Sequence, residues 1–262
     1  MIETPQAKTR FIDVVGRRIA ARHRAGSSPG LFWLGGFRSD MAGIKAEALD
    51  RFAAAKRFEA TRFDYSGHGE SGGDFAEGTI SRWLEEATGV FEQLTAGPQI
   101  VVGSSMGGWI ALLMNRALRE RGVTRIAGLV LIAPAIDMTE ELMRANFTKT
   151  ESARLERDGR IEQPSDNSDE PNVLTRALIE DGAKHFLFGT PIVTGCPVAI
   201  LQGAMDENVP PAQAIRLMTH LPSDEATLTL VPDGDHRLNR EADLKLLTET
   251  VGRMVEDAGP RI

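Results

Sequence analysis

The chain has very little cysteine and no long apolar segment. Its 262 residues include a single cysteine, and nowhere do 18 apolar residues follow one another. One cysteine cannot close a disulfide within the chain, so a disulfide-stapled scaffold is excluded. A membrane-spanning helix needs roughly 18 or more consecutive apolar residues, so none is expected here. Cys196 precedes Pro197 at the start of an apolar run, and we interpret it as a small buried hydrophobic residue.

The N-terminal segment lacks the pattern of an export signal. It has no charged stretch followed by an apolar stretch. Arginines between positions 10 and 24 would suit a mitochondrial transit peptide, but they alternate with apolar residues such as Phe11, Ile12 and Ile19. That alternation is typical of a strand hairpin, here around Gly16. We therefore expect a cytoplasmic, reducing location.

Basic residues are fewer than acidic ones. The chain has 30 Lys and Arg against 37 Asp and Glu, for a formal charge of -7. This balance disfavours binding to nucleic acid or anionic membranes, which requires basic patches. With 42% hydrophobic and 26% charged residues, the composition is that of an ordinary globular protein. The length suits one domain over residues 1–262, and the sequence leaves the oligomeric state open.

Strand and helix patterns alternate after the hairpin. Apolar runs at 31–34, 100–102, 126–133 and 198–201 predict buried strands. Helical spacing appears between them, at roughly 41–55, 80–94, 106–120, 211–220 and 241–255. Parallel strands need crossover connections, so this order predicts an α/β fold with a mostly parallel, twisted sheet flanked by helices. Functional groups should then lie at the carboxyl ends of the strands.

Residues 136–190 interrupt this alternation. Two helix-like pieces flank an acidic, proline-bounded loop at 164–171. In the second piece, Val173, Leu174, Ala177 and Leu178 form an apolar face. An insertion of this length between two strands, with helices of its own, predicts a small helical cap.

The pattern Gly-x-Ser-x-Gly occurs three times, around Ser28, Ser71 and Ser105. A nucleophilic serine of this pattern sits on a sharp turn between a buried strand and a helix. Only Ser105 has both, since Ser28 lies beside Pro29 in a loop and Ser71 lies in a glycine-dense turn with no helix directly after it. We predict that Ser105 is a nucleophile, with a purely structural turn as the alternative.

The dense turn at 67–72, Gly-His-Gly-Glu-Ser-Gly, also matches the dinucleotide-binding fingerprint. That fingerprint requires a helix that opens within the glycine run, so that its N-terminus meets the pyrophosphate. Here residues 74–78 intervene, and the candidate acid Glu92 falls inside a helical pattern. This turn therefore does not favour the alternative that the protein is a nicotinamide-dependent dehydrogenase.

A nucleophilic serine needs an imidazole base and a carboxylate that fixes its tautomer. His236 follows an alternating strand in the loop Pro-Asp-Gly-Asp-His, where it can reach across the sheet, and we predict it to be the base. His68 is its strongest competitor, but it precedes the serine and more naturally packs within its turn. The remaining histidines, His23, His185 and His220, are interpreted as structural.

Asp206 is the predicted acid. It follows the apolar run at 198–201 and enters a turn, which completes the order Ser, Asp, His. Asp137, one strand earlier, is an alternative acid, whereas Asp235 is interpreted as a turn residue.

Two backbone N–H groups are expected to stabilise the oxyanion of a tetrahedral intermediate. Met106, directly after the serine, is the first. The loop Leu-Gly-Gly-Phe at 34–37 supplies the second, and we assign it to Phe37, with Gly36 as an alternative. The alternative is that this loop is only a glycine turn that ends a strand.

Taken together, Leu-Gly-Gly-Phe, Phe-Asp-Tyr-Ser-Gly-His-Gly-Glu-Ser, Gly-Ser-Ser-Met-Gly-Gly-Trp, Gly-Ala-Met-Asp-Glu-Asn-Val-Pro and Gly-Asp-His resemble the α/β-hydrolase superfamily over nearly the whole chain. The segments Arg-Phe-Asp-Tyr-Ser-Gly and Gly-Pro-Gln-Ile-Val-Val-Gly-Ser-Ser-Met-Gly-Gly-Trp are similar to the branch that contains the mammalian mitochondrial palmitoyl-protein thioesterase, which also cleaves acyl glucuronides. The chain departs from that branch in its cap and in having no evident transit peptide.

The resemblance implies hydrolysis of a thioester or carboxylic ester through an acyl-enzyme on Ser105, without a metal or an organic cofactor. Consistently, no histidine or cysteine pair has metal-ligand spacing, and no phosphate-binding Gly-x-x-x-x-Gly-Lys-Ser/Thr loop is present. Arg38 could steer an acidic part of the substrate and Trp109 could line an acyl pocket, with solvated arginine and core tryptophan as the alternatives. A catalytically silent ligand-binding module on the same fold is the rival function.

Overall fold

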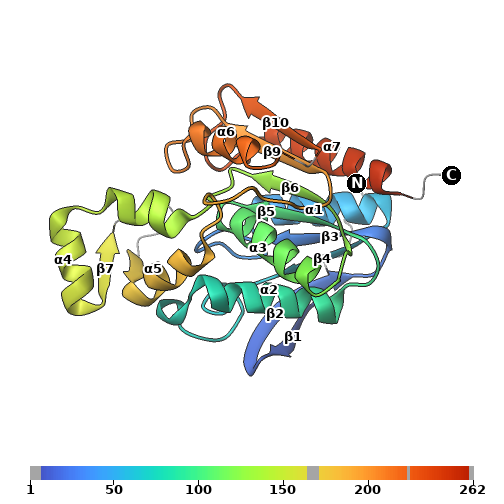
Figure 1. The fold of residues 1–262 in the computed structure, drawn as a ribbon. Helices are drawn as coiled ribbons and strands as arrows, with labels where there is room; N and C mark the ends of the chain where they lie inside the picture. Colours follow the sequence, from blue (N-terminus) through green and yellow to red (C-terminus); the bar gives the residue numbers. More distant parts are fainter. Residues whose placement is uncertain (1–6, 164–170, 223–224, 260–262) are drawn as a thin grey trace.

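An eight-stranded sheet forms the centre of the molecule (Figure 1), seen in a computed structural model that describes residues 7–163, 171–222 and 225–259. The strand order is β1-β2-β4-β3-β5-β6-β9-β10. β1 to β2 and β2 to β4 pair antiparallel, and all other pairs are parallel, as the alternating pattern predicts. The strands are β1 (Thr9–Val14), β2 (Arg17–Arg24), β3 (Ser27–Leu34), β4 (Phe58–Phe63), β5 (Gln99–Ser104), β6 (Ile126–Ile132), β9 (Val198–Gly203) and β10 (Ala226–Val231).

The predicted N-terminal hairpin is confirmed. Its two-residue turn consists of Val15 and Gly16, both with positive φ (52° and 75°). A turn of this kind matches the right-handed twist of antiparallel strands. The register opposes Ile12 to Ile19, and these two residues share the core-facing side with Val14. Phe11 lies on the other face and is exposed.

Helices cover both faces of the sheet. Buried strand residues alternate between them: Leu31 and Trp33 pack with α1 and α7, whereas Phe32 and Leu34 pack into the core beneath α2, α3 and α6. Two apolar faces on each central strand explain the continuous apolar runs of the sequence. The helices are α1 (Ile44–Lys56), α2 (Ile80–Leu94), α3 (Met106–Glu120), α6 (Pro211–Thr219) and α7 (Glu241–Ala258), with a short turn η1 (Phe75–Glu77) before α2.

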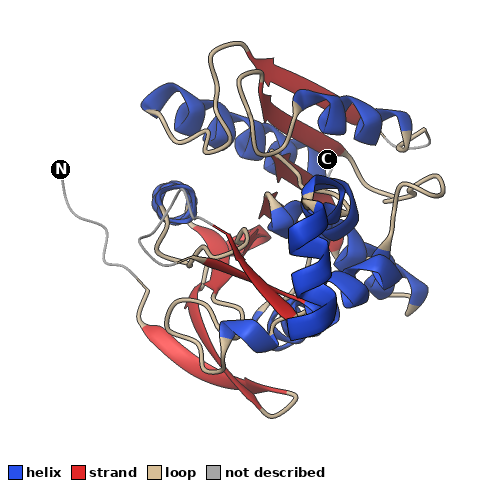
Figure 2. Cartoon of the chain, turned by 90° about the vertical axis from the view of Figure 1, so that its left-hand side faces the viewer, coloured by secondary structure: helices blue, strands red, loops and turns tan. Residues whose placement is uncertain are grey.

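The segment between β6 and β9 stands out from one end of the sheet. In Figure 1 its elements α4, β7 and α5 lie at the left, and Figure 2 views the molecule from that side. It leaves β6 at its carboxyl end, where parallel α/β sheets carry their functional groups. Its elements are η2 (Thr139–Met143), η3 (Arg144–Asn146), α4 (Lys149–Asp158), β7 (Arg160–Gln163), β8 (Asn172–Thr175), α5 (Arg176–Gly182) and η4 (Ala183–His185).

The interpretation of this segment as two helix-like pieces was partly wrong. Val173 and Leu174 lie in β8, which pairs antiparallel with β7, and the helix α5 begins only at Arg176. The strand pair is stabilised by burial, because Ile161 and Leu174 face each other and pack with Leu155 and Ile179 in a small separate core. Most of the acidic loop predicted at 164–171 lies outside the described residues.

Cys196 is half-buried and packs against the main core, so its predicted burial holds in part. In the described part of the chain, no helix has both the length and the hydropathy needed to cross a membrane.

Candidate active site

Ser105 lies on a sharp turn between β5 and α3, as predicted. Its backbone has φ 54° and ψ -118°, a conformation that side-chain-bearing residues rarely adopt. The neighbouring strand holds the turn: Ser105 N donates to Ile132 O at 2.8 Å, and Ala135 N donates to Ser105 O at 3.1 Å. The strain is therefore fixed by backbone hydrogen bonds on both sides of the serine.

The glycines around Ser105 are required by close backbone contacts. A Cβ on Gly103 would lie 2.3 Å from Gly107 O, and a Cβ on Gly107 would lie 2.1 Å from Leu34 O. Only glycine allows the start of α3 to approach β5 and the end of β3 so closely. The Gly-Gly pair after the serine thus brings the turn beside the loop that follows β3.

Asp206 and His236 meet Ser105 in space. Asp206 follows β9 and His236 lies in the loop after β10, so both come from the carboxyl ends of strands. His236 Nε2 lies 3.1 Å from Ser105 Oγ, and His236 Nδ1 lies 2.8 Å from Asp206 Oδ2. The carboxylate is fully buried, while the imidazole is 22% exposed. The histidine ring therefore links a sheltered acid to a serine that opens toward a cavity.

The local backbone fixes the orientation of Asp206. Its Oδ1 accepts hydrogen bonds from Asn208 N at 3.0 Å and Val209 N at 2.8 Å. Its Oδ2 faces His236 Nδ1, and a carboxylate oxygen only accepts, so that nitrogen carries the proton. His236 Nε2 then has a lone pair directed at Ser105 Oγ.

The competing residues have other partners. Ser71 Oγ donates to Asp64 O at 2.6 Å and accepts from Ala20 N at 2.8 Å, so it connects β2 to the glycine-dense turn. The alternative acid Asp137 is 1% exposed and accepts from Leu187 N and Phe188 N. Burial raises its pKa to about 6, while those two N–H groups lower it. Asp137 therefore connects the beginning of the segment 136–190 to its end.

The loop after β3 lies directly against Ser105. A Cβ on Gly36 would lie 3.3 Å from Ser105 Cβ. Gly36 and Phe37 line the same cavity as Ser105. Met106 opens α3, where the first N–H groups have no acceptor within the helix. The structure thus brings both predicted oxyanion residues, Phe37 and Met106, next to the serine.

The cavity at Ser105 has a volume of about 280 Å³ and a cationic lining. Three basic side chains line it, with Asp40 as the acidic one. Burial lowers the pKa of Lys45 to about 8, against the opposing effect of Asp235. The lining comprises Trp33, Gly36, Phe37, Arg38, Ser39, Asp40, Gly43, Ile44, Lys45, Ser104, Ser105, His236, Arg237 and Asn239.

The two predicted pocket residues differ in their placement. Arg38 lines the cavity; its guanidinium donates to Pro171 O at 2.5 Å and lies 5.0 Å from the centre of the Phe75 ring. Trp109 is fully buried in the main core, and its Nε1 donates to His185 O at 3.3 Å. Trp109 does not line this cavity, because its position on α3 directs it into the core.

Sequence reasoning missed several residues of the site. Gln202 contacts Asp206 from β9, and its signal was present, since it is a polar residue in an otherwise apolar buried strand. Lys45 and Arg237 also line the cavity. They carry no such signal, because a lysine in a helix and an arginine in a loop are ordinary surface residues.

No metal site is evident around these groups. Within residues 7–163, 171–222 and 225–259, no cluster of three or more His, Cys, Asp or Glu could hold a metal ion.

A strained serine between strand and helix, hydrogen-bonded to a histidine and an aspartate at later strand ends, defines the class of the α/β-fold serine hydrolases. Residues 25–250 match the model of the alpha/beta hydrolase family. The chain belongs to the α/β-hydrolase family.

Known proteins that are similar in sequence and in structure agree with this family assignment. The mouse protein named palmitoyl-protein thioesterase ABHD10, mitochondrial, is 32% identical over 239 residues, which are 91% of this chain and 79% of the mouse protein. The mouse ABHD10 structure matches with a TM-score of 0.87 and 30% identity, covering 96% of this chain and 99% of that one. A crystal structure from Agrobacterium vitis S4, described no further than as a hydrolase, matches with a TM-score of 0.92 and 46% identity, covering 96% and 100%.

Proposed function

We propose that this hydrolase cleaves carboxylic esters and thioesters through an acyl-enzyme formed on Ser105. The observation that carries the proposal is the placement of the His236 ring, 3.1 Å from Ser105 Oγ and 2.8 Å from Asp206 Oδ2. A serine hydroxyl is not ionised near neutral pH, so its attack on a carbonyl needs a base at this distance.

Acylation begins at Ser105 Oγ. His236 Nε2 takes the hydroxyl proton as the oxygen bonds to the substrate carbonyl carbon, and Asp206 stabilises the imidazolium that forms. The tetrahedral intermediate collapses, the bond to the alcohol or thiol breaks, and His236 returns its proton to that leaving group. Water then attacks the acyl carbon while His236 takes one of its protons. The bond from the acyl carbon to Ser105 Oγ breaks, His236 returns the proton to Ser105 Oγ, and the carboxylic acid leaves.

Phe37 N–H and Met106 N–H are the proposed donors to the oxyanion. They follow Gly36 and Ser105, whose β-carbon positions would be 3.3 Å apart, so one residue lies in the loop after β3 and the other at the start of α3, both beside the serine. Fixed donors of this kind stabilise negative charge as it develops and need no rearrangement during the reaction.

The segment 136–190 is proposed to act as the cap of this site. Its small core packs on the side chain of Phe37, and its residue Pro171 accepts the hydrogen bond of Arg38. Both contacts are to the loop after β3, so the segment adjoins the cavity at Ser105. A substrate larger than the cavity would have to contact it.

The proposed substrates are acylated molecules with an acidic portion near the ester. The name of the mouse relative supports a thioester with a long acyl chain. The basic lining by Arg38, Lys45 and Arg237 supports electrostatic attraction of a negatively charged group. We assign the steering role to Arg38. A cytoplasmic location stays a prediction, since the mouse relative is named mitochondrial.

The experiment that tests this function compares the wild-type protein with Ser105→Ala. We expect the wild type to hydrolyse p-nitrophenyl esters and acyl thioesters and to be labelled by a fluorophosphonate. Both properties should disappear in Ser105→Ala, while its circular dichroism spectrum is unchanged. Turnover that survives in Ser105→Ala would refute the proposal. A wild type that neither turns over nor labels, but binds a small apolar ligand, would support the silent binding module instead.

A further inference from the structure

The glycine-rich turn at 67–72 folds around Asp64 and directs His68 inward. Gly67 and Gly69 have positive φ values of 74° and 44°. A Cβ on Gly69 would lie 2.2 Å from Asp64 Oδ2, so the turn needs glycine at that position. His68 is left only 4% exposed. The turn thus places an imidazole inside the molecule, which neither the elbow pattern nor the dinucleotide fingerprint explains.

Each ring nitrogen of His68 has one partner, and together they define its tautomer. His68 Nδ1 lies 3.1 Å from Ser66 O, which can only accept, so Nδ1 carries the proton. His68 Nε2 therefore offers its lone pair, and it accepts from Arg38 N at 3.2 Å. Burial lowers the pKa of His68 to about 4, with a further lowering by Arg38 that Asp40 opposes. At neutral pH the ring is uncharged, as this arrangement requires.

The acceptor, His68 Nε2, is directed at the loop after β3, which carries Phe37 N–H, the proposed oxyanion donor. Arg38 directly follows Phe37 and has a positive φ of 56°, so the loop turns sharply at this point. The turn is closed on its other side, because Ser39 N and Ser39 Oγ donate to Gly36 O at 3.2 and 2.8 Å. The hydrogen bond from Arg38 N to His68 thus fixes the backbone one residue beyond the Phe37 amide.

The side chain of Phe37 shares its support with His68. The Phe75 ring lies 5.0 Å from Phe37 and 5.1 Å from His68, between ring centres. The Trp83 ring lies 6.0 Å from Phe37 and 5.3 Å from His68. All four pairs have the edge-to-face geometry that aromatic rings prefer. One aromatic cluster therefore holds Phe37 and His68 in a fixed relation.

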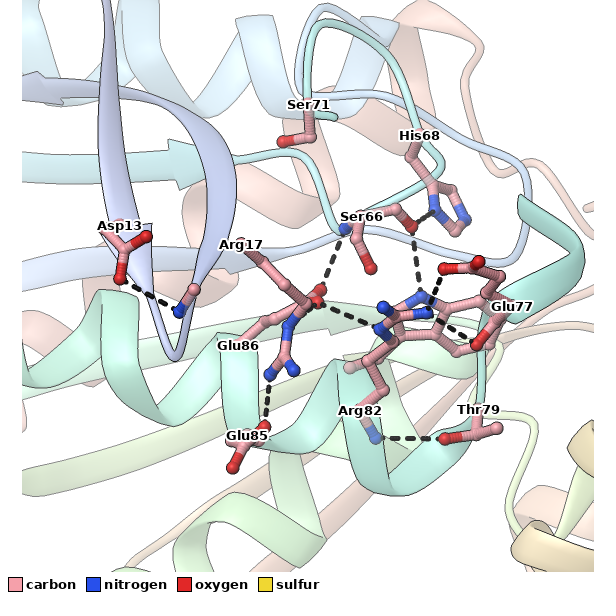
Figure 3. A network of polar contacts seen from close by, with 12 residues as sticks. Asp13, Arg17, Ser66, His68, Ser71, Glu77, Thr79, Arg82, Glu85 and Glu86 are labelled. Carbon is pink, nitrogen blue, oxygen red and sulfur yellow. Dashed lines mark hydrogen bonds and ion pairs between the residues drawn. The ribbon is translucent and has the colours of Figure 1, made fainter. Parts of the chain in front are cut away.

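A buried polar network in turn fixes His68. Ser66 O accepts from His68 Nδ1 and also from Trp83 Nε1 at 3.3 Å, and Ser66 N donates to Glu86 Oε2 at 2.8 Å. Glu86 is fully buried and pairs with Arg17 at 2.7 Å. Figure 3 shows this chain of contacts running from Arg17 through Glu86 and Ser66 to His68. The ring is anchored to the sheet on the side opposite Arg38.

We propose that His68 is a positioning residue for the oxyanion hole, which through Arg38 N holds the Phe37 amide in line with the developing oxyanion. The inference rests on the proposed function, because it assigns His68 a task in the same hydrolysis. His68 does not touch the substrate. It positions the Phe37 amide, a donor that matters most in the transition state. Loss of the His68 ring therefore lowers kcat and leaves KM nearly unchanged.

The test uses two amide substitutions that each mimic one ring nitrogen. His68→Gln places a side-chain oxygen near the position of Nε2, where it accepts from Arg38 N. His68→Asn reaches Ser66 O but is too short for Arg38 N. We expect kcat for a p-nitrophenyl ester to fall about ten- to a hundredfold in His68→Asn and to be largely restored in His68→Gln.

Two further readouts separate positioning from a general structural effect. Affinity for a trifluoromethyl ketone, whose adduct carries the oxyanion, should fall with kcat in His68→Asn, while KM stays within about twofold. The control His220→Asn alters a half-buried histidine that lies away from the cavity, with its Nε2 3.1 Å from Phe188 O. This variant should leave kcat and the affinity for the ketone unchanged.

Several results would overturn the inference. These are equal kcat values in the Asn and Gln variants, a loss confined to KM, or a ketone affinity that does not follow kcat. Should neither variant fold, nitrogen NMR of the wild-type protein labelled on histidine decides, because a proton on His68 Nε2 contradicts the proposal. A wild type whose turnover vanishes in Ser105→Ala keeps the proposed function even where the His68 inference fails.

Discussion

The side-chain amide of Gln202 donates to Asp206 Oδ2 at 3.0 Å, the same oxygen that faces His236 Nδ1. The other oxygen, Oδ1, accepts two backbone N–H groups. All four contacts require Asp206 to be an acceptor. The carboxylate can neither rotate nor donate without losing buried hydrogen bonds, so it imposes one tautomer on His236.

Asp206→Asn should therefore impair catalysis while keeping the overall fold, although the hydrogen bond from Gln202 is lost. An asparagine oxygen can keep the backbone N–H bonds, which turns its NH2 group toward His236 Nδ1 and forces the ring proton onto Nε2. That nitrogen can no longer take the proton of Ser105. We expect kcat for a p-nitrophenyl ester to fall about 10³- to 10⁴-fold.

Asp235→Asn is the matched control, one residue before the histidine. Asp235 Oδ1 accepts from Arg237 N and Leu238 N, both at 3.0 Å, and an amide oxygen can do the same. Its kcat should stay within about twofold of the wild type. Equal losses in the two variants would argue against Asp206 as the acid.

Gly107→Ala should destabilise the protein and abolish turnover. The added Cβ would lie 2.1 Å from Leu34 O and 2.6 Å from Gly35 O, which are backbone atoms that cannot move away alone. The start of α3 must shift from the loop after β3, which would separate Phe37 N–H from Met106 N–H, the two proposed oxyanion donors. We expect a loss of at least about 2 kcal/mol in the free energy of unfolding, measured with urea.

Gly252→Ala provides the contrast on α7. There a Cβ meets only Phe52, at 3.4 Å, which is an ordinary contact. Alanine in a helix interior is favoured over glycine by about 0.5–1 kcal/mol, so this variant should be more stable and fully active. A destabilised Gly252→Ala would show that the packing of α1 against α7 tolerates less than the distance indicates.

The stability of the protein should depend on the protonation of His68. Its pKa is about 4 in the folded protein and 6.5 in the unfolded chain. The unfolded chain binds the proton first as the pH falls through 6.5, so this contribution to stability is complete above 6.5 and is lost toward pH 4. The loss amounts to about 3 kcal/mol.

Urea titrations of the wild type and His68→Gln across this pH range measure the effect. The difference between the two curves isolates His68, because Asp137, whose pKa is raised to about 6, contributes with the opposite sign in both proteins. The free energy of unfolding should decrease less on acidification in the variant. Parallel curves would mean that His68 titrates normally in the fold.

Asp137→Ala should lower stability without removing catalysis. It leaves the N–H groups of Leu187 and Phe188 without their buried acceptor, at a cost of about 2–4 kcal/mol in the free energy of unfolding. Glu141→Ala, which breaks an ion pair with Arg216, should cost less than about 1 kcal/mol. If a folded Asp137→Ala variant lost turnover, the result would favour Asp137 over Asp206 as the acid that orients His236.

Much of the sheet and the placement of Ser105 could be predicted because their signals are local. Each central strand is a continuous apolar run, and the turn at Ser105 has a strand before it and a helix after it. The order of strand ends then placed Asp206 and His236 in reach of the serine, since parallel strands end at the same edge.

Other features depend on contacts that leave no local pattern. Every residue from Met106 to Met114 is buried, so periodicity cannot tell which side of α3 faces a cavity. For Trp109 the structure favours the alternative of a core tryptophan over a residue of the cavity at Ser105. The strand Asn172–Thr175 is four residues long and gains its stability from pairing and packing with Ile161 of β7. His68 pairs with a backbone N–H thirty positions away, and a backbone N–H has no signature in the sequence.

Ser105 and His236, the proposed nucleophile and base, are 131 positions apart in the chain. A growing polypeptide that has reached α5 already contains Ser105, Phe37 and Met106, but neither Asp206 nor His236, the side chains proposed to activate the serine. β9 and β10 join at one edge of the sheet, so hydrolytic competence arrives only with the last quarter of synthesis. The appearance of turnover during refolding should therefore report that β9 and β10 have joined the sheet, so it can be used to measure the rate of that step.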